Sequence, residues 1–129
     1  MPFEIIQHPG DAIFDVLPIV EVIYPAHPSD AEVAEYETRA RTIIDAQRRR
    51  PFLVLADQRA LRVMSPELVA MLIELNAYAA ARGMVRTARV VSTTIAGLQA
   101  HRLRRERRFE VQAFESRDEA MAWLRGGAA

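Results

Sequence analysis

The residues best suited to chemistry follow two apolar segments of the chain. Asp57 and Arg59 come after the run from Phe52 to Ala56, and three hydroxyl residues come after the run from Met84 to Val91: Ser92, Thr93 and Thr94. Hydroxyls at a helix start lie beside free backbone amides that favour an anion, and Arg59 could add a bidentate contact. We favour a simpler interpretation, a salt bridge between Asp57 and Arg59 and a cap on the next helix, because every helix start needs a cap.

The segment between these residues predicts how they are positioned. The run from Phe52 to Ala56 has the aliphatic content of a strand buried on both faces, and Ser65-Pro66-Glu67 is typical of a helix start. Apolar residues then recur at helical spacing up to Gly83, where the second apolar strand begins. This βαβ unit predicts an α/β domain with a parallel pair of strands at its centre. The carboxyl ends of parallel strands share one edge, where α/β proteins bind ligands.

Turn residues predict the start of the chain. Segments 3–8 and 12–16 flank the turn Pro9-Gly10-Asp11 and predict an opening hairpin, which is followed by a strand from Ile19 to Tyr24. Ser29 and Glu32 form a capping box for a helix that ends near residues 48–50.

Three more elements are predicted after the βαβ unit. The hydroxyl residues at 92–94 cap a helix from about Ile95 to Arg107, and a last strand follows at 109–114. Ser116 and Glu119 open a short final helix.

Composition narrows the classes of function. The chain has 129 residues and a mass of 14.6 kDa, so we expect a single domain spanning residues 1–129. Its apolar runs are far shorter than the roughly 20 residues that cross a bilayer, and its first residues lack a signal-peptide pattern, so we expect a cytoplasmic location. The sequence contains neither Cys nor Lys, which excludes disulfides, thiolate chemistry and Schiff bases. No motif implies a cofactor.

Neither the charge pattern nor the histidines indicate a further site. The 17 basic and 17 acidic residues balance, and the basic run from His101 to Arg108 has no interleaved aromatic residues for base stacking. We interpret this run as a solvated helix face and do not expect nucleic acid as a partner. His8, His27 and His101 show no metal-ligand spacing, so no metal site is predicted.

The element order and five short segments resemble the STAS superfamily, specifically its small bacterial SpoIIAA-like or STAS/SEC14-type members. The segments are Val-Leu-Ala-Asp at 54–57, Met-Ser-Pro-Glu-Leu at 64–68, Arg-Gly-Met at 82–84, Ala-Arg-Val-Val at 88–91 and Phe-Glu-Ser-Arg-Asp-Glu-Ala-Met-Ala-Trp-Leu at 114–124. The resemblance covers nearly the whole chain. It implies a mixed sheet with flanking helices and a regulatory or binding role without catalysis. STAS antagonists of anti-sigma factors bind a partner kinase and are switched by phosphorylation of a Ser at the helix after the central strand.

Ser65 occupies the place of that phosphorylated residue, but its surroundings depart from the family motif. Classical members carry Asp-Ser-Ser-Gly or Asp-Ser-Thr-Gly, whereas this chain has Met64-Ser65-Pro66-Glu67. Ser followed by Pro and Glu is also an ordinary helix start. We therefore interpret Ser65 as a helix cap rather than an obligatory phosphorylation site.

The resulting expectation is a non-catalytic regulatory module that binds a protein partner, a second copy of itself or a small anion. One alternative is a small-molecule hydrolase or transferase that uses Asp57, Arg59 and Ser92. Another is a structural subunit that only self-associates. The helix from Pro66 to Arg82 favours a homodimer, because from Leu68 to Ala81 it has only two strongly polar residues and a monomer would have to cover almost its whole surface.

Overall fold

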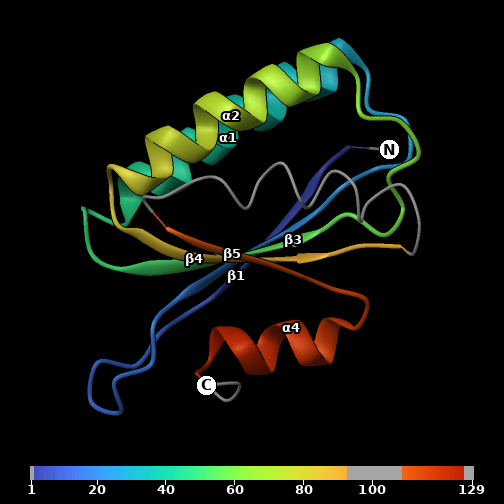
Figure 1. Cartoon of the computed structure of the whole chain (residues 1–129). Coiled ribbons are helices and arrows are strands. Elements are labelled where there is room, and N and C mark those ends of the chain that lie inside the picture. Colours follow the sequence, from blue (N-terminus) through green and yellow to red (C-terminus); the bar gives the residue numbers. More distant parts are fainter. Residues whose placement is uncertain (1, 93–108, 127–129) are drawn as a thin grey trace.

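The computed structural model describes residues 2–92 and 109–126, and within them a five-stranded sheet carries helices on both faces (Figure 1). The strands follow one another in space in their sequence order: β1 (Glu4–His8), β2 (Ile19–Ile23), β3 (Phe52–Asp57), β4 (Met84–Val90) and β5 (Glu110–Phe114). β1 is antiparallel to β2, and the other neighbouring pairs are parallel. The predicted α/β domain with a parallel pair at its centre is confirmed.

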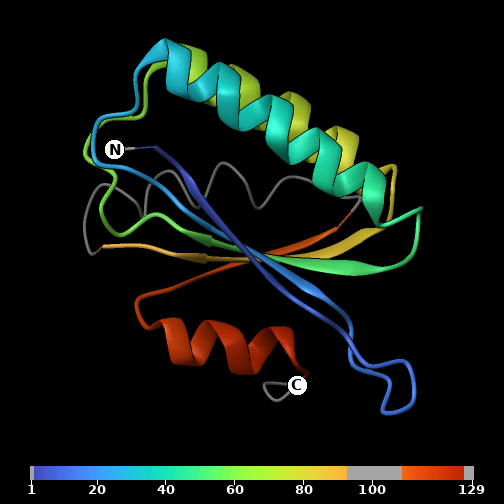
Figure 2. The same ribbon diagram turned by 180° about the vertical axis from the view of Figure 1, so that it is seen from behind.

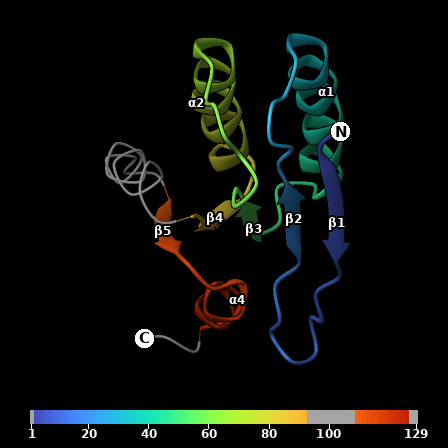
Figure 3. The same cartoon turned by 90° about the vertical axis from the view of Figure 1, so that its right-hand side faces the viewer.

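The helices divide between the two faces of the sheet. α1 (Asp30–Ala46) and α2 (Pro66–Ala80) lie side by side over one face, and α4 (Arg117–Leu124) covers the other (Figures 2 and 3). Figure 3 looks along the sheet and shows α1 over the β1 and β2 side, with α2 over the β3 and β4 side. The inner strands β2 and β3 are buried on both faces, as the apolar run of β3 predicts, whereas the edge strands β1 and β5 are partly exposed.

Side-chain caps begin α1, α2 and α4 at the predicted residues. The Ser29 hydroxyl accepts a hydrogen bond from the Glu32 amide at 3.1 Å, and the Glu32 carboxylate accepts from the Ser29 amide at 3.0 Å, which completes the capping box. The Ser65 hydroxyl accepts from the Leu68 amide at 3.1 Å. The Ser116 hydroxyl accepts from the amide three residues later at 3.3 Å. The capping role predicted for Ser65 is confirmed.

Two apolar clusters hold the layers together. The larger one joins the sheet to α1 and α2, with residues such as Val22, Phe52 and Leu72 at its centre. The smaller one joins the other sheet face to α4 through residues that include Leu55 and Trp123. Successive residues of a strand point to opposite faces, so β3 contributes to both clusters in alternation.

The connection from α2 to β4 depends on Gly83. This residue has a φ of 115°, and a Cβ placed there would collide with the carbonyl oxygen of Arg50. The Gly83 carbonyl accepts a hydrogen bond from the Phe52 amide at 3.0 Å. The glycine that the sequence marks as a helix stop thus also lets β4 return close beside the start of β3.

The predicted opening hairpin is wrong in its second strand. β1 pairs with β2 rather than with residues 12–16, which form a loop closed by two hydrogen bonds of 2.8 Å between Asp11 and Val16. The Asp11 carboxylate accepts from the Ile13 amide at 3.0 Å, a local turn that competes with strand pairing. Ile13 and Phe14 are 88% and 75% exposed, so their apolar spacing reflects no buried face.

The structure describes only part of the chain after β4. The predicted final strand corresponds to β5. The helix predicted from about Ile95 to Arg107 and the basic run from His101 to Arg108 lie outside the described residues.

Candidate ligand-binding edge

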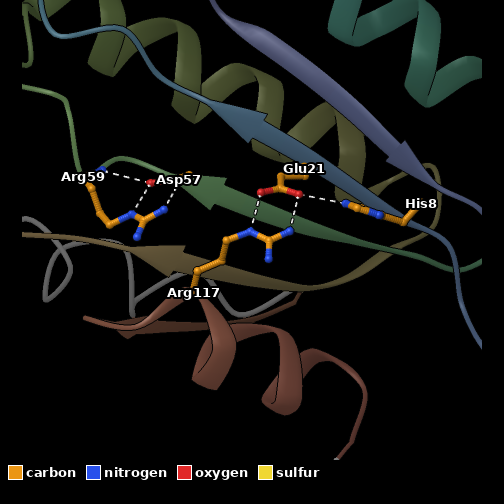
Figure 4. A network of polar contacts seen from close by, with 5 residues as sticks. All are labelled: His8, Glu21, Asp57, Arg59 and Arg117. Atoms are coloured by element: carbon orange, nitrogen blue, oxygen red, sulfur yellow. Dashed lines mark hydrogen bonds and ion pairs between the residues drawn. The ribbon is translucent and has the colours of Figure 1, made fainter.

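Asp57 and Arg59 form the local salt bridge that the sequence predicts. Arg59 donates from Nε to Oδ1 at 3.0 Å and from Nη2 to Oδ2 at 2.7 Å, and its backbone amide donates to Oδ1 at 3.2 Å (Figure 4). The Asp57 side chain is only 8% exposed. The hydrogen bonds to Asp57 raise the pKa of Arg59. Both carboxylate oxygens of Asp57 are therefore already occupied.

The hydroxyl part of the predicted site is only partly described. Ser92 is exposed directly after the end of β4, whereas Thr93 and Thr94 lie outside the described residues. An anion site that combines these hydroxyls with Arg59 therefore stays a prediction.

A second ion-pair network lies on the same face of the sheet, toward α4. Arg117 donates from Nε to Oε2 and from Nη2 to Oε1 of Glu21, each at 2.8 Å, and His8 Nε2 lies 2.8 Å from Glu21 Oε1 (Figure 4). The Glu21 side chain is 3% exposed. The hydrogen bonds from Arg117, with a smaller contribution from His8, lower the pKa of Glu21 to about 2 although burial opposes the shift.

Sequence reasoning missed the role of Glu21, although a signal was present. Glu21 stands alone among Ile19, Val20, Val22 and Ile23. A charge in the middle of an otherwise apolar strand needs a buried partner. The identity of that partner, Arg117, is visible only in the structure.

A third polar group lies on the opposite face, toward α1 and α2, and we call it the Arg89 cluster: Tyr24, Tyr36, Gln58 and Arg89. Arg89 precedes the last residue of β4, while Tyr24 and Gln58 directly follow β2 and β3. The Tyr24 amide donates to the Asp57 carbonyl at 2.9 Å, and the Gln58 amide donates to the Val90 carbonyl at 2.8 Å. These bonds align the carboxyl ends of three adjacent strands.

The guanidinium of Arg89 is buried and only partly hydrogen-bonded. Arg89 is 2% exposed, and its Nε and Nη2 both donate to Gln58 Oε1, at 2.9 and 2.5 Å. Its Nη1 has no hydrogen-bond partner among the residues that the structure describes. Such an orphaned buried donor requires an explanation, because leaving it unpaired costs roughly 1–3 kcal/mol.

The neighbours of Arg89 do not neutralise its charge. Burial lowers the pKa of Arg89, and burial raises the pKa of both Tyr24 and Tyr36. These two tyrosines therefore remain neutral hydroxyls at neutral pH. Within residues 2–92 and 109–126, Arg89 forms no ion pair with a carboxylate. The positive charge of the cluster consequently has no counter-charge in the part of the chain that the structure describes.

The concave regions formed by the described residues lie away from this edge. A cavity of about 40 Å³ lies under α1 and α2 and is lined mostly by apolar side chains such as Val22, Phe52 and Leu75. Wider grooves of about 720 and 620 Å³ flank the loop at residues 11–16, next to the opposite ends of the parallel strands. The first cavity is far smaller than the roughly 300–1,000 Å³ typical of small-molecule sites.

Neither a metal centre nor a membrane-spanning helix is found in the parts of the chain that the structure describes. Those parts contain no group of three or more His, Cys, Asp or Glu residues that could hold a metal ion. None of their helices is long and apolar enough to cross a bilayer.

Comparison with known proteins bears on the fold. No protein-family model matches the sequence, and no curated protein matches it. Among solved structures, an uncharacterized protein of the DUF3478 family from Shewanella loihica PV-4, described as having a SpoIIAA-like fold, superposes with a TM-score of 0.71. The match covers 95% of this chain and 94% of that chain at 12% sequence identity. This chain has the SpoIIAA-like fold.

The SpoIIAA-like fold is the one that the resemblance of the sequence to STAS domains implied, so that prediction is confirmed. At 12% identity the likeness extends to the fold alone, because one fold hosts many functions. Function must therefore be argued from the residues of this chain.

Proposed function

We propose that this SpoIIAA-like domain is a non-catalytic binding module whose ligand or partner meets the carboxyl edge of the parallel strands. The observation that carries this proposal is the contrast between the two faces of that edge. On the α4 face Asp57 is held by Arg59, whereas on the other face the charge of Arg89 has no counter-charge among the described residues. An edge where the acidic side chain is already paired and a buried cation has no described counter-charge is suited to binding an anionic group.

The contacts of Asp57 weigh against the alternative of a hydrolase or transferase at this edge. A general base needs a free lone pair directed at the proton that it removes. Both oxygens of Asp57 accept hydrogen bonds from Arg59 instead. Arg59 takes three of the roughly four acceptor sites of this carboxylate, and the Asp57 side chain is only 8% exposed, so little of it is accessible to a substrate. Ser92 is exposed at the end of β4 without a described base beside it.

A regulatory role is the other part of the proposal, and it rests on the resemblance to STAS domains. Ser65 stands where the switch residue of that family stands, at the start of the helix after the central strand. Its hydroxyl is engaged as the cap of α2, so we expect regulation through binding rather than through obligatory phosphorylation of Ser65.

An activity screen tests the catalytic side of the proposal. We expect no esterase, phosphatase or nucleotidase turnover by the wild-type protein. The matched pair is Asp57→Asn and Asp45→Asn, since Asp45 has a side chain that is 56% exposed and lies on α1. Turnover that disappears in folded Asp57→Asn but persists in Asp45→Asn would establish an enzyme at this edge.

Native mass spectrometry tests the binding side. For protein purified without denaturation we expect a species heavier than the 14.6 kDa chain, with the additional mass lost on denaturation. A bare monomer in every preparation would contradict the proposal.

A further inference from the structure

We propose that the Arg89 cluster binds the oxyanion group of a ligand, a carboxylate or a phosphate, beside Nη1 of Arg89. This inference deepens the proposed function and rests on it, because it assigns a chemical class of ligand to the same edge.

Arg89 differs from three other arginines of the sheet and α4 region in having no described carboxylate partner. Arg59 and Arg117 each donate two side-chain hydrogen bonds to a carboxylate, and Arg86, also on β4, lies 3.5 Å from the Glu110 carboxylate. Their side chains are 48%, 35% and 35% exposed. Arg89 is the buried one of this group and faces a neutral amide. A buried charge without a partner is strongly unfavourable, so a bound anion would stabilise this arrangement.

The guanidinium of Arg89 is held in one orientation by Gln58. Gln58 Oε1 accepts from both Nε and Nη2 and therefore fixes the plane of the guanidinium while leaving its charge intact. The Nη1 donors point to no described hydrogen-bond acceptor. A guanidinium held in this way is preorganised for an oxyanion, because planar N–H groups match the lone pairs of carboxylates and phosphates.

Two tyrosine hydroxyls, those of Tyr24 and Tyr36, belong to the same cluster. The hydroxyl of Tyr24 is close enough to Arg89 for the charge of Arg89 to act on its pKa, and it is hydrogen-bonded to Gln58 and Tyr36. Burial keeps both tyrosines protonated. Since the Tyr36 hydroxyl is already bonded to Tyr24, Tyr24 is the residue whose hydroxyl can donate to an anion. The cluster thus offers donors around one buried positive charge.

The position of the Arg89 cluster in the sheet also favours a ligand site. Tyr24, Gln58 and Arg89 come from the carboxyl ends of β2, β3 and β4, three adjacent parallel strands. This edge is where open α/β sheets bind ligands. Tyr36 is added from α1, so the cluster combines residues from four elements.

Thermal unfolding in inorganic phosphate tests the proposal. Phosphate is titrated against sodium chloride at constant ionic strength, and the midpoint temperature is followed for wild type, Arg89→Met and Arg86→Met. Arg86 is the matched control because it lies on the same strand and contacts Trp123 on the α4 face. We expect a saturable rise of about 5 °C at ten times the dissociation constant in wild type and Arg86→Met, and no saturable rise in Arg89→Met.

Phosphate also stabilises proteins without binding to a site, and the control accounts for this effect. Equal rises in all three proteins would overturn the proposal, as would the absence of a saturable rise in wild type. An arm with sodium acetate in place of phosphate separates the two ligand chemistries: a rise only in phosphate assigns a phosphate group, and a rise in acetate assigns a carboxylate.

Gln58→Glu provides a second test that does not depend on removing the arginine. The new carboxylate would lie where Gln58 Oε1 now accepts from Arg89 and would supply an internal counter-charge. We expect this variant to unfold at a higher temperature than wild type in chloride and to lose the saturable response to phosphate and acetate. A Gln58→Glu protein that keeps the full wild-type response would contradict the proposal even if Arg89→Met fails to fold.

The outcomes separate this inference from the proposed function. No anion response together with no turnover in the activity screen would remove the anion site and leave the binding module with another ligand. Turnover dependent on Asp57 would remove the proposed function whatever the response of Arg89.

Discussion

Arg117, in the first turn of α4, donates two hydrogen bonds of 2.8 Å to the carboxylate of Glu21 on β2, 96 residues earlier in the chain. Glu21 is almost fully buried between the sheet and α4, and His8 on β1 contacts the same carboxylate. The apolar contacts of Trp123 and Leu124 hold α4 against the sheet, and the ion pair fixes its first turn. One carboxylate thus links β1, β2 and α4.

We predict that Glu21 contributes a pH-dependent part of the stability. Its pKa is lowered from 4.5 to about 2 in the folded protein, so the unfolded chain binds this proton first as the pH falls. The contribution is complete above the unfolded value, decreases as the pH falls from about 4.5 to about 2, and amounts to at most about 3 kcal/mol. Urea unfolding of wild type and Glu21→Gln across this range measures it.

The control for this prediction is Glu110→Gln, because Glu110 has a side chain that is 66% exposed and lies 3.5 Å from Arg86. Glu21→Gln should lose about 1–3 kcal/mol at neutral pH and show a flatter pH profile. If both variants follow the wild-type pH profile, Glu21 is not the source of the effect.

Ser65→Ala should reduce the free energy of unfolding by about 1 kcal/mol, because the Leu68 amide loses its partner at the start of α2. Ser65→Asp keeps an oxygen acceptor at the N-cap and should retain most of the stability. Chemical denaturation of the three proteins measures the difference. A stoichiometric phosphate on Ser65 in protein from its native host would contradict our interpretation of this residue as a cap alone.

Gly83→Ala should destabilise the protein by about 2–4 kcal/mol, because the new Cβ meets both an unfavourable φ and the carbonyl of Arg50. Gly126→Ala is the matched control: Gly126 also has a positive φ, of 83°, but a Cβ there would meet no atom within 4 Å. Its cost should be about 1–2 kcal/mol. Equal costs in thermal or urea unfolding would show that the close approach to Arg50 is unimportant.

We propose that α2 mediates self-association, and the structure suggests where. Val69 and Ile73, one helical turn apart on α2, are 38% and 57% exposed. Sedimentation equilibrium at micromolar concentration should show a dimer that Ile73→Glu and Ala77→Glu weaken and Glu74→Gln does not. A 14.6 kDa species in wild type, unchanged by these substitutions, would rule out the interface.

The sequence predicted those helices and strands whose signals lie within a few neighbouring residues. The capping residues Ser29, Ser65 and Ser116 start helices as expected, and the βαβ unit around β3 has the predicted parallel pairing. The predicted strand at residues 12–16 is wrong because apolar content alone does not make a strand: Ile13 and Phe14 are exposed, and the hydrogen bonds that close the loop join Asp11 to Val16.

Contacts between distant residues could not be predicted in the same way. Asp57 and Arg59 are two residues apart, and their salt bridge was foreseen. Glu21 and Arg117 meet only because α4 packs on the face of the sheet to which Glu21 points. Arg89 meets Gln58 only because β3 and β4 are neighbours. A charge inside an apolar strand, such as Glu21 in β2, signals that a partner is needed, but the packing of the sheet and helices decides which residue it is.

The sheet order also has a consequence for synthesis of the chain on the ribosome. Each described strand pairs with its neighbour in the sequence, so the sheet can grow by one strand at a time as the chain emerges from the N-terminus. Glu21 belongs to an early strand, whereas Arg117 emerges near the end. A nascent chain that already contains β2, β3 and β4 therefore lacks the cation that neutralises Glu21, and its C-terminal helix completes the domain last.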